Sequence, residues 1–210
     1  MFQFSLFGIN TYLVYDPVTL CCAVIDPGMI HKEEENAISD YILKNNLKLT
    51  HIINTHLHID HVAGDNYLKK KYEAPLLANA GDLFLLKNLQ AQAELFGLPI
   101  KFDAIEIDQN LEPGEVIKIG KGELKVIGVP GHSKGSITLY DPRDKFLIAG
   151  DALFQGSIGR TDLPGGNHSE LLKNIKENLF SLPDDTVVYP GHGPSTTIGA
   201  EKKFNPFFYE

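Results

Sequence analysis

The stretch Thr55–His61 constrains this chain more than any other, because it places three histidines and an aspartate within seven positions. The apolar pair Ile52 and Ile53 leads into it, and Gly64 follows. Burying several neighbouring imidazoles in a packed core without hydrogen-bond partners costs free energy. Neutral imidazoles beside a carboxylate instead suit a borderline metal such as zinc. The stretch therefore predicts a metal site, for which the rest of the chain must supply further ligands.

Three further apolar runs end in a glycine followed by a potential ligand. They are Val126–His132, Phe146–Asp151 and Val187–His192. The glycine allows a sharp backbone turn that points the polar side chain off the sheet edge. Taken singly, a Pro-Gly-His sequence is more typical of a turn. Together with the first cluster, these runs predict four strand ends that converge on one edge, where open sheets usually place their sites.

The candidate ligands number seven nitrogen and oxygen donors, which is too many for one tetrahedral ion and right for two ions that share a ligand. A carboxylate is the natural bridge, because each of its oxygens can bind one ion, and Asp151 is the carboxylate that stands alone. The candidates are His56, His58, Asp60, His61, His132, Asp151 and His192.

Helical periodicity predicts helices over 31–45, 82–96 and 169–180, and the leucine-rich stripe of the second is expected to be core. Between 105 and 149, short alternating runs separated by Gly, Pro and Asp predict a β-meander. These blocks predict two packed sheets with helices outside. We expect one domain spanning residues 1–210.

Composition narrows the classes of partner that this chain is expected to bind. The net charge is −8 and the pI about 5.5, which argues against binding nucleic acid. No apolar run reaches the ~20 residues of a membrane span, and Met1–Asn10 has no signal-peptide pattern, so we expect a cytoplasmic protein acting on a small molecule. We expect Cys21 and Cys22 to be small buried hydrophobic residues in a reducing compartment. The alternative is that they form a reactive or metal-binding pair.

The order His-x-His-x-Asp-His, Gly-His, Gly-Asp, Gly-His resembles the metallo-β-lactamase superfamily, from Asp26 to His192. The resemblance implies an α+β fold, the four-layer αββα sandwich. It also implies a first metal held by three histidines, a second held by Asp60 and two histidines, and a bridging Asp151. The implied first set is His56, His58 and His132, and the second is Asp60, His61 and His192.

Within the superfamily, His58 stands where the oxygen-reducing diiron branch usually has glutamate, which favours hydrolysis. Asp151 stands where many β-lactamases carry cysteine, so antibiotic hydrolysis is not expected. Segments 150–162 and 189–197 resemble glyoxalase II, in its short single-domain type II group. The resemblance implies a hydroxyacylglutathione hydrolase-like thioesterase acting on S-lactoylglutathione in methylglyoxal detoxification. Gly193 and Pro194 depart from the glutamate and tyrosine of the longer enzymes, so their glutathione pocket is not assumed.

The implied cofactors are two divalent ions, with zinc expected and iron or manganese as alternatives. Two metals lower the pKa of a bound water from ~15.7 toward ~7, and the resulting bridging hydroxide would attack the thioester carbonyl. Asp60 is expected to orient this hydroxide and accept its proton. Arg160 and Lys134 are candidate contacts for a substrate carboxylate, with a solvated surface charge as the competing interpretation.

Two other functions remain open. The sequence Gly-Arg-Thr-Asp over 159–162 also occurs in persulfide dioxygenases, which would need one iron held by His56, His132 and Asp151. The other is a metal-binding module without catalysis. Asp26 likewise has two interpretations, as turn chemistry alone or as a buried acid beneath the site.

Overall fold

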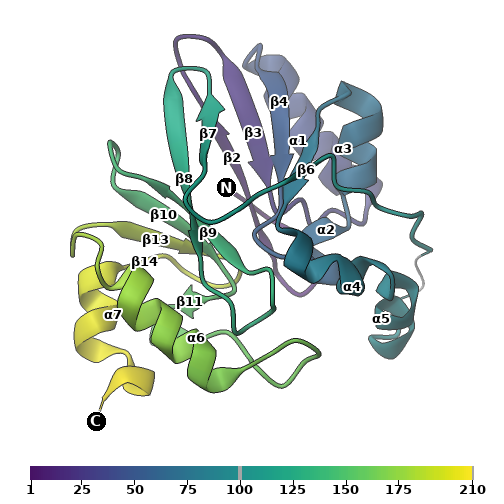
Figure 1. The fold of residues 1–210 in the computed structure, drawn as a ribbon. Coiled ribbons are helices and arrows are strands. Elements are labelled where there is room, and N and C mark those ends of the chain that lie inside the picture. Colours follow the sequence, from purple (N-terminus) through teal and green to yellow (C-terminus); the bar gives the residue numbers. More distant parts are fainter. Residues whose placement is uncertain (99–100, 210) are drawn as a thin grey trace.

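The computed structural model describes residues 1–98 and 101–209, and it places two six-stranded sheets face to face (Figure 1). The first sheet runs in the order β1 (Phe2–Gln3), β2 (Asn10–Tyr15), β3 (Cys21–Ile25), β4 (Lys48–Ile53), β5 (Leu76–Ala78) and β6 (Gln109–Asn110). From β3 to β6 the strands are parallel.

The second sheet contains the predicted meander. It runs in the order β14 (Thr196–Thr197), β13 (Val187–Pro190), β10 (Phe146–Gly150), β9 (Ile137–Asp141), β8 (Gly122–Gly128) and β7 (Val116–Ile119). Strands β7 to β10 are antiparallel, whereas β13 joins β10 in parallel. A short ribbon of β11 (Leu153–Phe154) and β12 (Ser157–Ile158) follows Asp151.

Helices cover the outer face of each sheet (Figure 1). Those of the first half are α1 (Lys32–Lys44), α2 (Ile59–Val62), α3 (Asp65–Tyr72), η1 (Ala80–Asp82), α4 (Leu83–Leu86) and α5 (Leu89–Leu95). Those of the second half are α6 (His168–Asn174), the π-helical turn η2 (Ile175–Leu179), α7 (Ile198–Phe204) and η3 (Pro206–Phe208). Among the described residues, no helix combines the length and apolarity that crossing a membrane requires.

Strand β4 shows why the sandwich forms. Successive side chains of a strand point to opposite faces, and here both faces are apolar. Ile52 packs with α1 and α3 in the outer core, while Ile53 packs against Val126 and Leu139 of the second sheet. A third core joins the second sheet to α6 and α7. Three cores separate four layers, so the predicted αββα sandwich is confirmed.

The helix predicted over 82–96 is wrong as a single element, because it breaks between α4 and α5. Asn88 causes the break: its side-chain amide donates to the Phe84 carbonyl at 2.8 Å, and its backbone N–H bonds Leu85 instead of continuing the regular pattern. The expected core stripe also divides. Leu85, Leu89 and Ala93 are buried, whereas Phe96 reaches the surface.

Candidate metal centre

The seven predicted ligands lie together at one edge of the sandwich. His56, His58, Asp60 and His61 occupy the loop after β4 and the short helix α2. The other three follow the ends of β8, β10 and β13, as the glycine-terminated runs predicted. They are His132, Asp151 and His192.

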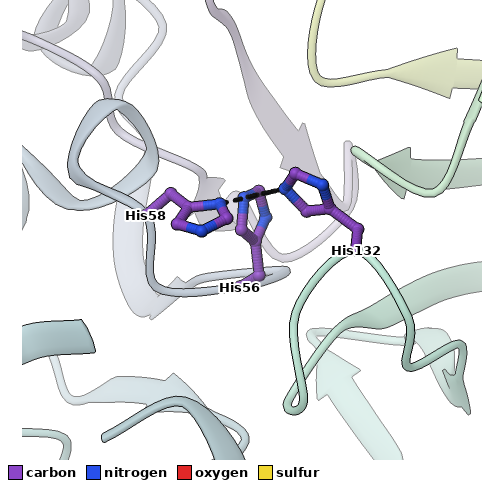
Figure 2. A group of neighbouring side chains, drawn as sticks. All are labelled: His56, His58 and His132. Carbon is purple, nitrogen blue, oxygen red and sulfur yellow. Dashed lines mark hydrogen bonds between the residues drawn. The ribbon is translucent and has the colours of Figure 1, made fainter. Parts of the chain in front are cut away.

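Three imidazoles form the first group, and Figure 2 shows them turned toward one another. The Nε2 atom of His132 lies 2.9 Å from Nδ1 of His58 and 3.1 Å from Nε2 of His56. Zinc–nitrogen bonds of about 2.0–2.1 Å at tetrahedral angles would separate ligand nitrogens by about 3.3 Å. The three nitrogens are therefore spaced to share one ion.

Asp60, His61 and His192 form the second group. Oδ2 of Asp60 lies 3.0 Å from Nε2 of His192 and 3.7 Å from Nε2 of His61. Asp151 stands between the two groups. Its Oδ1 is 3.4 Å from Nε2 of His61, and its Oδ2 is 3.8 Å from Nε2 of His132. This placement suits a carboxylate shared by two ions.

Partners outside the cluster fix how the histidines are presented. Nδ1 of His132 donates to the Arg160 carbonyl at 2.8 Å, and Nδ1 of His192 donates to the Phe7 carbonyl at 3.2 Å. Each bond leaves Nε2 free to face the cluster. Such outer bonds set the tautomer of a ligating histidine and orient its ring.

Burial decides the charge of His56 and His58. Burial, and then the neighbouring imidazoles, holds the pKa of His56 well below its ordinary value. Burial and the adjacent His132 lower the pKa of His58 to about 4. Both rings are therefore neutral at pH 7, which is the form that binds a metal.

For His61 and the neighbouring Asp151, nearby charges outweigh the effect of burial on the pKa. Burial alone would lower the pKa of His61, but its carboxylate neighbours, Asp26 first, raise it well above the ordinary value. Burial would likewise raise the pKa of Asp151, but the nearby imidazoles, His61 first, hold it below its ordinary range. A cation at this place would replace the proton on His61, so metal uptake is coupled to proton release.

Unpartnered polar atoms test whether metals fit the site. Among the described residues, Nε2 of His61 and Oδ1 of Asp151 are buried without a hydrogen-bond partner. Each such atom costs about 1–3 kcal/mol if nothing satisfies it. Both belong to the cluster, and a divalent ion would satisfy each of them, so the residues present fit metal binding.

Asp26 is the buried acid beneath the site, as the second of its two interpretations proposed. Its Oδ1 accepts the backbone N–H of Thr55 at 2.7 Å and its Oδ2 accepts the Thr55 hydroxyl, also at 2.7 Å. Oδ2 also lies 3.1 Å from Nδ1 of His61. Asp26 thus ties the start of the histidine loop to a ring of the second group.

We expect Asp26→Asn to weaken zinc affinity about 10–100-fold, as loss of an outer histidine partner typically does. The fold should persist, because Asp26 has a φ of +51° and Asn adopts that region as readily as Asp. Zinc titration against a competing chelator measures the effect, with the exposed Asp185→Asn as control. Equal affinities in both variants would assign Asp26 to turn chemistry alone.

Asp82 is a residue that the sequence did not reveal. It is buried, and its Oδ2 accepts the Ser133 hydroxyl at 2.6 Å and the Leu57 N–H at 3.3 Å, while its Oδ1 accepts the Gly135 N–H at 2.7 Å. It therefore fastens the loop of His56 and His58 to the loop of His132. In sequence it is only the start of a leucine-rich helix.

At two of the strand ends, the space beside the backbone is too small for any residue with a Cβ atom. Gly150 has a φ of +50°, and a Cβ there would meet the Thr55 side chain. A Cβ on Gly191 would collide with Oδ1 of Asp151 and with the His61 ring at 2.8 Å. Both glycines let backbone approach the ligand cluster closely.

The N-terminal segment closes over the last ligand loop. The Asn10 N–H donates to the Gly191 carbonyl at 2.7 Å, and its side-chain amide donates to the carbonyls of Pro190 and Gly193 at 3.1 and 2.8 Å. The Tyr12 hydroxyl adds a bond to Pro190 at 2.6 Å. These contacts hold His192 in place.

A cavity of about 560 Å³ opens on the cluster and reaches Asp60, Asp151 and His192. Arg160 lines it, but Nε and Nη2 of Arg160 donate to the Asp162 carboxylate at 2.7 and 2.8 Å. The Arg160 bond lowers the pKa of Asp162 to about 2, so the pair stays ionised. Lys134 places Nζ 5.6 Å from the ring centroid of Phe84.

Two groups of potential metal ligands at one edge of an αββα sandwich are the arrangement expected of a binuclear metal site, and the comparisons give the family. The chain belongs to the metallo-beta-lactamase superfamily, whose family model matches residues 5–192. The hydroxyacylglutathione hydrolase GloC of Haemophilus influenzae is 38% identical over 205 residues, covering 97% of this chain and 94% of that protein.

Solved structures of the same fold include the BLEG-1 B3 metallo-beta-lactamase, with a TM-score of 0.89, and TTHA1623 in a di-iron-bound form, with a TM-score of 0.86. Each is 33% identical and covers 99% of this chain and 98% of its own. ETHE1 from Myxococcus xanthus is 28% identical, with a TM-score of 0.78, covering 98% of this chain and 84% of its own.

Proposed function

We propose that this chain is a binuclear-metal hydrolase of small thioesters, with S-lactoylglutathione or a related hydroxyacyl thioester as its substrate. The observation that carries the proposal is the pair of ligand groups, with Asp151 between them, at the floor of the cavity. The likeness to a hydroxyacylglutathione hydrolase supports a hydroxyacyl thioester as the class of substrate. The proposed metal is zinc, and the proposed setting is the cytoplasm.

Two bound divalent ions would supply a nucleophile at neutral pH by lowering the pKa of water, and would polarise the carbonyl oxygen. The chain's own residues do the rest. Asp60 lines the cavity and contacts Nε2 of His192, so we assign it to orient the attacking water and accept its proton. A thiolate leaves readily, so no strong general acid is needed.

The test is turnover of S-D-lactoylglutathione by purified protein of known metal content. We expect near two equivalents of zinc per chain, and thiol release that a chelator abolishes and added zinc restores. Iron is measured beside zinc, because the TTHA1623 structure holds two irons. A β-lactam is assayed in parallel. Failure to hydrolyse any thioester would overturn the proposal.

The second candidate is the persulfide dioxygenase, favoured by the closeness of its three ligands. Nε2 of His132 lies within 3.1 Å of Nε2 of His56 and 3.8 Å of Oδ2 of Asp151. One iron per chain, with oxygen uptake on glutathione persulfide and no thioester hydrolysis, would establish this function instead.

A further inference from the structure

The walls of the cavity differ in chemistry from its floor. The floor consists of ligand side chains, whereas α4, α5 and the N-terminal turn supply large apolar groups to the walls. Large apolar side chains that line the cavity include Phe7, Phe84, Leu85, Leu95, Phe96 and Leu163.

The polar side chains in these walls already have partners within the protein. Asn88 donates to the Phe84 carbonyl at 2.8 Å, and Gln92 donates to the Leu85 carbonyl at 2.9 Å. Outside the ligand cluster, Arg160 is the one cation among the described lining residues, and Asp162 occupies two of its donors. Among the described lining residues, the walls therefore offer a substrate carboxylate no cation that lacks an ionic partner.

The rim of the cavity exposes apolar surface to water. Leu95 is 77% exposed, Phe7 50% and Phe96 39%. The rings of Phe7 and Phe96 meet with centroids 5.1 Å apart and planes at 68°. Exposed apolar groups gathered around a concave site mark a place that an apolar ligand covers.

We propose that the carrier thiol of the substrate is apolar, an aliphatic or aromatic thiol held between α4–α5 and Phe7. This inference rests on the proposed thioester hydrolysis and selects, within it, a related hydroxyacyl thioester in place of S-lactoylglutathione. A lactoyl group has three carbons, and its carbonyl and hydroxyl would face the ligand floor, so the carrier would fill the remaining cavity. Glutathione would set two carboxylates and an ammonium against these apolar walls, and their desolvation opposes binding.

The test holds the lactoyl group constant and varies the thiol. S-lactoyl thioesters of ethane-, butane- and hexanethiol have leaving groups of similar basicity, and spontaneous hydrolysis is subtracted for each. For zinc-loaded protein we expect kcat/KM to rise about threefold to fourfold per added methylene. The hexanethiol ester should exceed S-D-lactoylglutathione at least tenfold.

A flat series, or preference for the glutathione ester, would overturn the apolar carrier while leaving thioester hydrolysis intact. Hydrolysis of none of these esters would instead overturn the proposed function. The two failures are therefore distinguishable.

Phe96→Ser gives a second test, with Phe204→Ser as the control because Phe204 is 62% exposed at the end of α7 and is absent from the described cavity lining. We expect Phe96→Ser to raise KM for the hexanethiol ester about tenfold, with kcat and the ethanethiol ester changed less than twofold. Phe204→Ser should change neither. Equal losses on both esters in Phe96→Ser would contradict the inference.

Discussion

Asp151→Ala is expected to lower kcat/KM for thioester hydrolysis about 10³-fold or more, because several kcal/mol of charge stabilisation depend on the metals that this carboxylate would bridge. Metal content should fall below two equivalents per chain. The fold should persist, since the side chain stands at the end of β10 and faces the cavity, outside the three apolar cores.

Turnover, metal content and circular dichroism are measured on the same preparation of Asp151→Ala. Asp144→Ala is the matched control, because Asp144 is an exposed aspartate paired with Arg143 on the surface. Full activity with two bound metals in Asp151→Ala would show that the bridging assignment is wrong. Loss of the native spectrum would call for Asp151→Asn, which keeps the shape but weakens metal binding.

His192→Ala separates the two candidate functions. On the hydrolase proposal, one metal is lost and kcat/KM falls about 10²–10³-fold. On the dioxygenase alternative, the ligands are His56, His132 and Asp151, so iron content and oxygen uptake should be unchanged. The substitution is tolerable because the His192 side chain is partly exposed and its removal admits water to its partner Asp60.

Metal content and both activities are measured in His192→Ala beside His168→Ala, which removes an exposed histidine from α6. Unchanged thioester hydrolysis with two metals in His192→Ala would rule out its assignment to the second group.

The sequence was informative where function requires particular residue types in a fixed order. Thr55–His61 and the three Gly-ligand strand ends predicted which side chains meet, because sheet topology brings strand ends to one edge. The sandwich itself followed from blocks of period-2 and helical patterns. These signals are local, so a single sequence carries them.

What the sequence could not show depends on particular side-chain contacts, both distant and local, that periodicity and motif spacing do not reveal. Asp82 looks like a helix start, yet it joins two ligand loops through Leu57 and Ser133. Phe96 fits a core stripe by spacing, but the break at Asn88 turns it to the cavity rim. Arg160 was predicted as a substrate contact, and its partner two residues on now competes for its donors.

The hydrogen bonds between Asn10 and the loop of His192 join segments that are synthesised early and late in translation. At about 5–20 residues per second, the roughly 140 residues between His56 and His192 take on the order of 7–30 s to synthesise. During that interval the first histidines have left the ribosome while the last ligand, and the loop that Asn10 holds, do not yet exist. The full set of seven candidate ligands therefore exists only after translation has passed His192.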